Sequence, residues 1–475
     1  MIDNTIIVLV GLFIIIAIVN DWRIGVPTAL YVGFSQESLR KIIPDQPVYL
    51  NLLIVVVIVL TFFSAITQLN RFSLSDTFQR NKNLINLFHI FIVFIIIQAT
   101  NAFLRTSSPI VSILGILVYL LPLLVITLTY YYFHHPQNFE KLALIYVLIN
   151  IVVACSIYLE WSNIVDWQIL KPIGEALRIT DSRISDGFLI SHAGLMRTSE
   201  VAAWHMGTSI CATFLLFLAG SYKKISFMVL PVIMLLFSAG LLTGRRKFIV
   251  TVVTFLASYA ILYLLSSISV TKKMSIQPLI ILMILLLIGS ISLNSILDTD
   301  IFDAYTTRGT VSASDVQDRF SELGLGSLQW ALNRGNWLGF GAGVVSQGSQ
   351  YVSGDISSDE YSMLAGASEG GLGKIIIELG VLGLILCAVI VYMLTQYLWK
   401  TLLSMHQADT RLGNLVNGIL AFQIANFAVF TSAVQIYGDP FVLTIQGFCM
   451  GFVFASWKFI SYESQPISQP RKHKI

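Results

Sequence analysis

The feature that most constrains this sequence is a series of apolar runs, each long enough to cross a lipid bilayer. A spanning helix needs about 20 mostly apolar residues, because the hydrocarbon core is about 30 Å thick and each helical residue rises about 1.5 Å. Hydrophobic residues make up 56% of the 475 residues and charged residues only 12%, which is too apolar for a soluble globular protein. The sequence therefore predicts an all-α polytopic integral membrane protein.

About twelve transmembrane helices are expected, within a range of about 11 to 13. A shorter apolar segment at 24–34 predicts either a thirteenth span or an interfacial helix, and this choice decides on which side the N-terminus lies. The twelve longer runs cover residues 5–19, 47–66, 84–104, 110–133, 141–158, 201–220, 225–243, 246–268, 275–294, 372–398, 412–434 and 440–460.

These runs divide the chain into four predicted parts. Residues 1–294 form an N-terminal transmembrane bundle with an outer loop at 159–200. Residues 295–371 form a large extracytoplasmic loop with short helices, because their charged and glycine-rich sequence interrupts the apolar pattern. Residues 372–460 supply the C-terminal transmembrane helices, and 461–475 form a basic cytoplasmic tail.

Charge and cysteine content narrow the functional classes. The net charge of +3 is small for this length, so we expect no nucleic-acid partner and regard the lipid bilayer as the main environment. The four cysteines lie far apart inside apolar runs, and no Cys, His or Asp cluster has the spacing of zinc ligands. We therefore expect neither a cofactor nor an obligatory metal.

One basic loop does not fit the orientation that the other loops predict. Cytoplasmic loops of membrane proteins carry an excess of Lys and Arg, so the basic tail lies inside, and alternation places loops 159–200, 295–371 and 435–439 outside. The same count places the GRRK sequence at 244–247 on the outer face. Either the count is off by one span, or these residues are interfacial anchors, or they bind an anion such as a lipid-linked diphosphate.

Three short motifs follow one another between about residues 190 and 400. A Thr-Gly-Arg-Arg turn at 243–246 opens a predicted span. The large loop then carries Arg319, Trp330 and the glycine-rich run WLGFGAG at 337–343, and a Glu-Leu-Gly-x-x-Gly pattern follows at 378–383. In this combination the sequence resembles the O-antigen polymerase and ligase superfamily, multispanning enzymes that transfer a glycan from an undecaprenyl diphosphate carrier at the outer face of the bacterial inner membrane.

The resemblance implies a glycosyltransferase, and one departure from the family pattern favours a polymerase. Ligase members carry a histidine late in the large loop, whereas residues 295–371 contain none. The resemblance then implies an O-antigen or exopolysaccharide polymerase of the bacterial inner membrane, multi-pass, with its active site facing the periplasm or exterior. Its implied partners are an undecaprenyl diphosphate-linked oligosaccharide and a chain-length regulator protein.

The chemistry of such a transfer suggests roles for particular residues. Negative charge grows on the departing diphosphate, and arginines stabilise it. We expect Arg246 and Arg319 to act there and Glu369 to accept the proton of the attacking sugar hydroxyl, a contribution that is typically about 100- to 10,000-fold. The expected substrate-binding residues are Arg197, Arg245, Glu200 and His205, the last two also being candidate bases.

Simpler explanations exist for several of these residues. Glu200 and Glu369 lie where a helix N-terminus favours a carboxylate, and Arg197 lies where it could merely anchor a span. His205 could form a hydrogen bond to a neighbouring helix inside the membrane. The alternative functions are an O-antigen ligase-type transferase and a lipid-linked oligosaccharide flippase or exporter. A flippase should carry ionisable residues through the middle of many spans, whereas here they gather near the predicted outer face.

Overall fold

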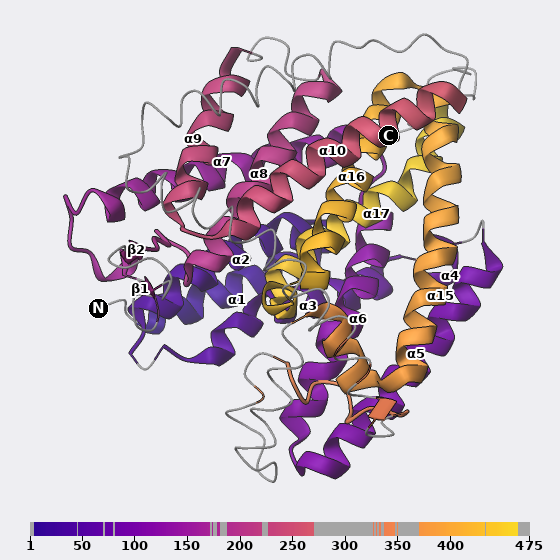
Figure 1. The fold of residues 1–475 in the computed structure, drawn as a ribbon, viewed down its shortest axis with the longest axis horizontal. Coiled ribbons are helices and arrows are strands. Elements are labelled where there is room, and N and C mark those ends of the chain that lie inside the picture. The colour runs from indigo at the N-terminus through magenta and orange to yellow at the C-terminus, as the bar shows by residue number, and fades with distance from the viewer. Residues whose placement is uncertain are drawn as a thin grey trace, which may run out of the picture.

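A computed structural model describes most of the chain as long helices packed side by side (Figure 1). The described residues are 4–44, 46–69, 72–78, 81–171, 173, 178–180, 188–220, 227–269, 326, 329, 332–333, 337–346, 349, 370–432 and 434–463. The helices are α1 (Asn4–Asn20), α2 (Gly25–Ile42), α3 (Leu53–Gln68), α4 (Leu74–Thr77), α5 (Lys82–Thr106), α6 (Pro109–Tyr132), α7 (Pro136–Trp161), α8 (Ser199–Ala219), α9 (Val229–Leu242), α10 (Arg246–Ser269), α15 (Gly371–Ala408), α16 (Thr410–Ser432) and α17 (Pro440–Glu463). Two short strands, β1 (Arg178–Thr180) and β2 (Phe188–Ile190), pair antiparallel before α8.

The membrane character expected from the apolar runs is confirmed. Nine helices within the described residues are long and apolar enough to cross a bilayer, and each coincides with a predicted run. The runs at 5–19 and 225–243 correspond to α1 and α9, of which α9 has only 14 residues. The run at 275–294 and nearly all of the large loop lie outside the described residues. The chain is a multi-pass membrane protein, and the part of it that the structure describes is almost entirely α-helical.

The weak apolar segment at 24–34 belongs to a longer helix, α2, whose second half carries polar and charged residues. Just ahead of α2, the Trp22 amide donates to Gln68 at the end of α3, and the Gln36 side chain accepts from the Ile54 amide at the start of α3. Helix α2 therefore lies antiparallel to α3 along its length. Gln36 and Glu37 are fully buried, and other elements supply partners for Oε1 of Gln36 and for both carboxylate oxygens of Glu37.

Contacts between segments that are distant in sequence show which of the connections between helices lie together at each end of the bundle. At one end, which we call the Arg245 end, the starts of α8, α10 and α17 meet the ends of α2, α7 and α9. At the other, the Arg411 end, Arg411 pairs with Glu140, and Lys458 donates to the Tyr130 carbonyl. Described parts of two loops predicted to lie outside, 159–200 and 435–439, meet at the Arg245 end, and the basic turn at 244–247 lies with them.

The glycine-rich segment 337–346 is seated between α5, α6 and α15. Its Phe340 and Gly341 amides donate to the carbonyls of Ile377 and Glu378 at 2.7 and 3.0 Å. Those carbonyls are free because α15 is interrupted at Gly380, where φ is +72° and ψ is −174°. The second and third sequence motifs therefore contact each other directly.

The fully buried side chain of Glu378 also fixes the segment 337–346 in place. Its Oε1 accepts from the Val345 amide at 3.1 Å and from the Ser346 hydroxyl at 3.2 Å, and its Oε2 accepts from the Tyr119 hydroxyl at 2.7 Å. Lys374 donates to the same Ser346 hydroxyl at 3.1 Å. With three hydrogen-bond donors, the Glu378 carboxyl group is well satisfied in the bundle interior.

Candidate functional site

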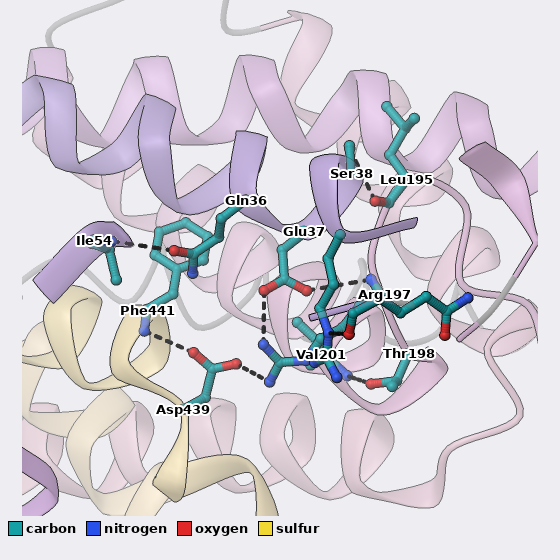
Figure 2. A network of polar contacts seen from close by, with 12 residues as sticks. Gln36, Glu37, Ser38, Ile54, Leu195, Arg197, Thr198, Val201, Asp439 and Phe441 are labelled. Carbon is teal, nitrogen blue, oxygen red and sulfur yellow. Dashed lines mark hydrogen bonds and ion pairs between the residues drawn. The ribbon is translucent and has the colours of Figure 1, made fainter. Parts of the chain in front are cut away.

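The strongest electrostatic feature of the Arg245 end is a buried cluster of one arginine and two carboxylates (Figure 2). Arg197 donates through Nη1 to Oε1 of Glu37 at 3.0 Å and through Nη2 to Oδ2 of Asp439 at 2.5 Å. The exposed fractions of the three side chains are 7%, 0% and 1%. Burial lowers the pKa of Arg197, and the carboxylates of Asp439 and Glu37 more than offset this, so that its pKa lies above the ordinary value.

The cluster joins three parts of the chain that are far apart in sequence. Glu37 lies near the end of α2, Arg197 lies just ahead of α8, and Asp439 directly precedes α17. The Arg197 amide also donates to Glu37, at 3.3 Å, and the other oxygen of Asp439 accepts from the Phe441 amide at 2.7 Å. With both carboxylates committed to it, the Arg197 guanidinium is held in place and has its charge neutralised.

The segment 191–198, which carries Arg197, is fixed by side chains from two helices. Oε2 of Glu160, at the end of α7, accepts from the amides of Ala193 and Gly194 at 2.8 and 2.6 Å. Lys41, at the end of α2, donates to the Gly194 carbonyl at 2.6 Å. Gly194 has φ +58°, which an L side chain rarely adopts, so this turn depends on glycine. The segment therefore forms a rigid platform.

The basic turn lies against this platform. Gly244, with φ +68°, donates to the Leu241 carbonyl at 2.9 Å and turns the chain from α9 into α10. Arg245 donates through Nε to the Ser199 hydroxyl at 3.0 Å, and Lys247 pairs with Glu200. Two of the residues expected to bind substrate, Arg245 and Glu200, are thus brought to adjoining positions by the turn and the start of α8.

The cations at this end differ in how far their charge is neutralised. Arg197 has two carboxylate partners and Lys247 has one. Half-buried Arg245 has only a hydroxyl partner, with no carboxylate within ion-pair distance among the described residues. Its other guanidinium N–H groups remain available to an anion.

His205 lies away from this surface, one helical turn deeper in α8, and is fully buried. Its Nδ1 is 2.7 Å from the Tyr146 hydroxyl, and its Nε2 has no hydrogen-bond partner among the described residues. The rings of Phe34, Phe441 and Trp204 surround it at centroid distances of 5.1, 4.8 and 5.0 Å. In this structure His205 contacts side chains of neighbouring helices.

Three other expected site residues cannot be placed with their side chains. Arg319 and Glu369 lie outside the described residues, and Arg246 is described only as the first residue of α10. Conversely, nothing in the sequence indicated that Glu37 and Asp439 would be partners of Arg197. The one available signal for Glu37 was a carboxylate just beyond an apolar segment, and Asp439 lies directly before a proline that begins a span.

The described residues contain no group of three His, Cys, Asp or Glu side chains arranged to hold a metal ion. The expectation that no metal is required stays a prediction, because the large acidic loop is not among them. Comparisons with protein-family models, curated proteins and solved structures found no match to this chain.

Proposed function

We propose that the protein is a polysaccharide polymerase that transfers glycan repeat units from an undecaprenyl diphosphate carrier. The observation that carries the proposal is Arg245, a cation on a fixed turn whose charge no described carboxylate neutralises. A diphosphate fits this position, because guanidinium groups form bidentate, charge-assisted hydrogen bonds with phosphate oxygens.

The start of α10 adds to the attraction for an anion. The first amides of a helix have no partner within the helix, and the aligned peptide dipoles place about half a positive charge there. Helix α10 begins at Arg246 and has 24 residues, so its positive end coincides with the basic turn. Arg245, the start of α10 and, in this proposal, the Arg246 side chain together bind the diphosphate.

The proposed reaction joins the anomeric carbon of a carrier-linked glycan to a hydroxyl of the next repeat unit. As the bond to the diphosphate oxygen breaks, negative charge grows on the leaving group, and fixed cations stabilise it without a proton transfer. Arg319 and Glu369 of the large loop complete the site in this proposal. The topology that goes with it has about twelve spans, with the large loop and the Arg245 end facing the exterior of the bacterial inner membrane.

A ligase-type transfer to a different acceptor would use the same cations and differs in the acceptor alone. A flippase needs polar side chains along a path across the membrane. In the described residues the buried ion cluster and Lys41 lie at the Arg245 end, and the pair of Glu140 and Arg411 lies at the opposite end. This separation supports chemistry at one face over transport.

The test is mass spectrometry of carrier-linked and surface glycans in cells with and without the gene. A polymerase predicts that cells without it accumulate single repeat units on the carrier at the outer face. Full-length chains stranded on the carrier would identify a ligase. Units trapped at the inner face would identify a flippase and refute the proposal.

A further inference from the structure

We propose that His192 is the general base of the glycan transfer, with Glu160 as its orienting carboxylate. This inference rests on the proposed function and adds a catalytic residue to it. Neither residue belongs to the sequence motifs, and the large loop that carries the family's histidine contains no histidine here. The structure places His192 beside the basic turn, on the fixed segment 191–198 and not on the large loop.

A backbone hydrogen bond joins His192 directly to the end of α9, which leads into the basic turn. Its amide donates to the Leu242 carbonyl at 3.2 Å, and Leu242 is the last residue of α9. Arg245 follows three residues later, after the tight turn at Gly244. His192 and Arg245 therefore lie on neighbouring, mutually bonded segments at the end of the bundle where the diphosphate is proposed to bind.

Glu160 is positioned to orient the imidazole. Oε1 of Glu160 lies 3.3 Å from Nδ1 of His192, but the two atoms do not meet hydrogen-bond geometry. Oε2 of the same carboxylate is fixed by the amides of Ala193 and Gly194. In the proposed step Nδ1 donates to Glu160, and a carboxylate on Nδ1 leaves Nε2 as the proton acceptor.

The two ring nitrogens of His192 have different surroundings. Nδ1 is enclosed next to Glu160, whereas Nε2 has no partner among the described residues and is not enclosed. The side chain is 14% exposed, in contrast to the fully buried ring of His205. His192 can thus present Nε2 to an acceptor hydroxyl from the surface, which the buried His205 cannot do without rearrangement.

The step balances with groups already named. Nε2 of His192 takes the proton of the acceptor sugar hydroxyl while that oxygen forms a bond to the anomeric carbon of the carrier-linked chain. The bond between the anomeric carbon and the diphosphate oxygen breaks, and its electron pair remains on the diphosphate beside Arg245. The imidazolium then returns its proton to water, so no oxidant, reductant or additional reactant is needed.

The charged groups around His192 suit a ring that carries a positive charge for part of the proposed step. Glu160 on α7 faces the ring and stabilises the positive charge, while Lys41 on α2 is bonded to the Gly194 carbonyl. Other described cations at this end include Arg197, which is paired with Glu37 and Asp439, Lys247, which is paired with Glu200, and Arg245 on the basic turn. A positioned base of this kind typically contributes about 100- to 10,000-fold to the rate.

The inference is tested with purified full-length protein in lipid vesicles and carrier-linked repeat units extracted from cells that lack the gene. We expect His192→Ala and His192→Gln to lower kcat by about 100- to 10,000-fold with little change in the KM for the carrier-linked donor. Added imidazole should restore part of the kcat of His192→Ala, an effect that a merely structural role would not produce. His134→Ala, a change of an exposed histidine at the Arg411 end, is the matched control and should retain wild-type kcat.

The outcomes separate this inference from the proposed function. If cells without the gene still make normal polymer, the proposed function itself fails. If those cells lack polymer but either His192 variant retains wild-type kcat, or shows only a raised KM, His192 is not the base and the proposed function stands. If His192→Ala does not fold, the His192→Gln variant, which keeps a polar side chain at this position, decides, since retention of its kcat would equally overturn the assignment.

Discussion

Replacing Arg197 by methionine should destabilise the protein severely, because it leaves two buried carboxylates without their cation. Arg197→Met keeps a long apolar side chain but removes the bonds to Glu37 and Asp439, whose exposed fractions are 0% and 1%. Hydrogen bonds to charged groups contribute about 1.5 to 3 kcal/mol each, so the two side-chain bonds together account for about 3 to 6 kcal/mol. Breaking a buried ion pair by removing one partner costs about 3 to 5 kcal/mol, in agreement.

A triple variant separates the stability lost with the arginine side chain itself from the stability lost because two carboxylates remain buried without a cation. Arg197→Met combined with Glu37→Gln and Asp439→Asn removes both unpaired carboxylates, and replacing a complete buried ion cluster with neutral groups is often close to neutral. We therefore expect the triple variant to regain most of the stability lost by Arg197→Met alone. This strong departure from additivity is the signature of residues that act as one unit.

The assay is equilibrium unfolding in mixed micelles, with Arg105→Met as the matched control. Arg105 is exposed and donates to Asn101, so its loss should cost less than about 1 kcal/mol. The reasoning is refuted if Arg197→Met is as stable as the control, or if the triple variant is no more stable than Arg197→Met. Either result would mean that the three side chains are not coupled in the folded protein.

Three further predictions concern the basic turn and the glycine-rich seat. Arg246→Ala should insert and express normally but lose polymer, measured on surface glycans; normal polymer from a normally expressed variant would remove Arg246 from the site. Gly380→Ala should destabilise the protein, because φ is +72° and the new Cβ would lie 2.3 Å from the Trp337 carbonyl oxygen, whereas Gly11→Ala, which meets nothing within 4 Å, should be neutral in thermal unfolding. A cysteine at position 244 should react with an impermeant thiol reagent added outside the cell, and protection from that reagent would place the Arg245 end inside.

The spans could be predicted because hydrophobic length is set by the bilayer and needs no knowledge of partners. The predicted runs at 84–104 and 110–133 agree closely with α5 and α6, since lipid-facing and buried positions in these helices are equally apolar. The basic turn was also expected on the same side of the bundle as loops 159–200 and 435–439, and the contacts of Arg245 and Arg197 agree with this. Hydropathy and charge alternation were sufficient for both.

The contacts within the site could not be predicted in the same way. Helix α2 extends to Ile42, well past its apolar segment, because Gln36, Glu37 and Lys41 find partners in other elements. No local rule connects Glu37 to an arginine 160 residues away. The break at Gly380 likewise depends on the segment that fills it, so the sequence predicted a glycine-containing helix start but not the seat for residues 337–346.

The ion cluster at the Arg245 end has a consequence for how the chain is made. Arg197 follows Glu37 by 160 residues, and Asp439 follows Arg197 by another 242. At about 5 to 20 residues per second, the ribosome needs tens of seconds to supply the whole cluster after α2 has left the exit tunnel. During that interval α2 carries an uncompensated carboxylate, which the membrane interior disfavours. Helix α2 should therefore reach its final depth late, and chains that end before α17 should be preferred targets of membrane quality-control proteases.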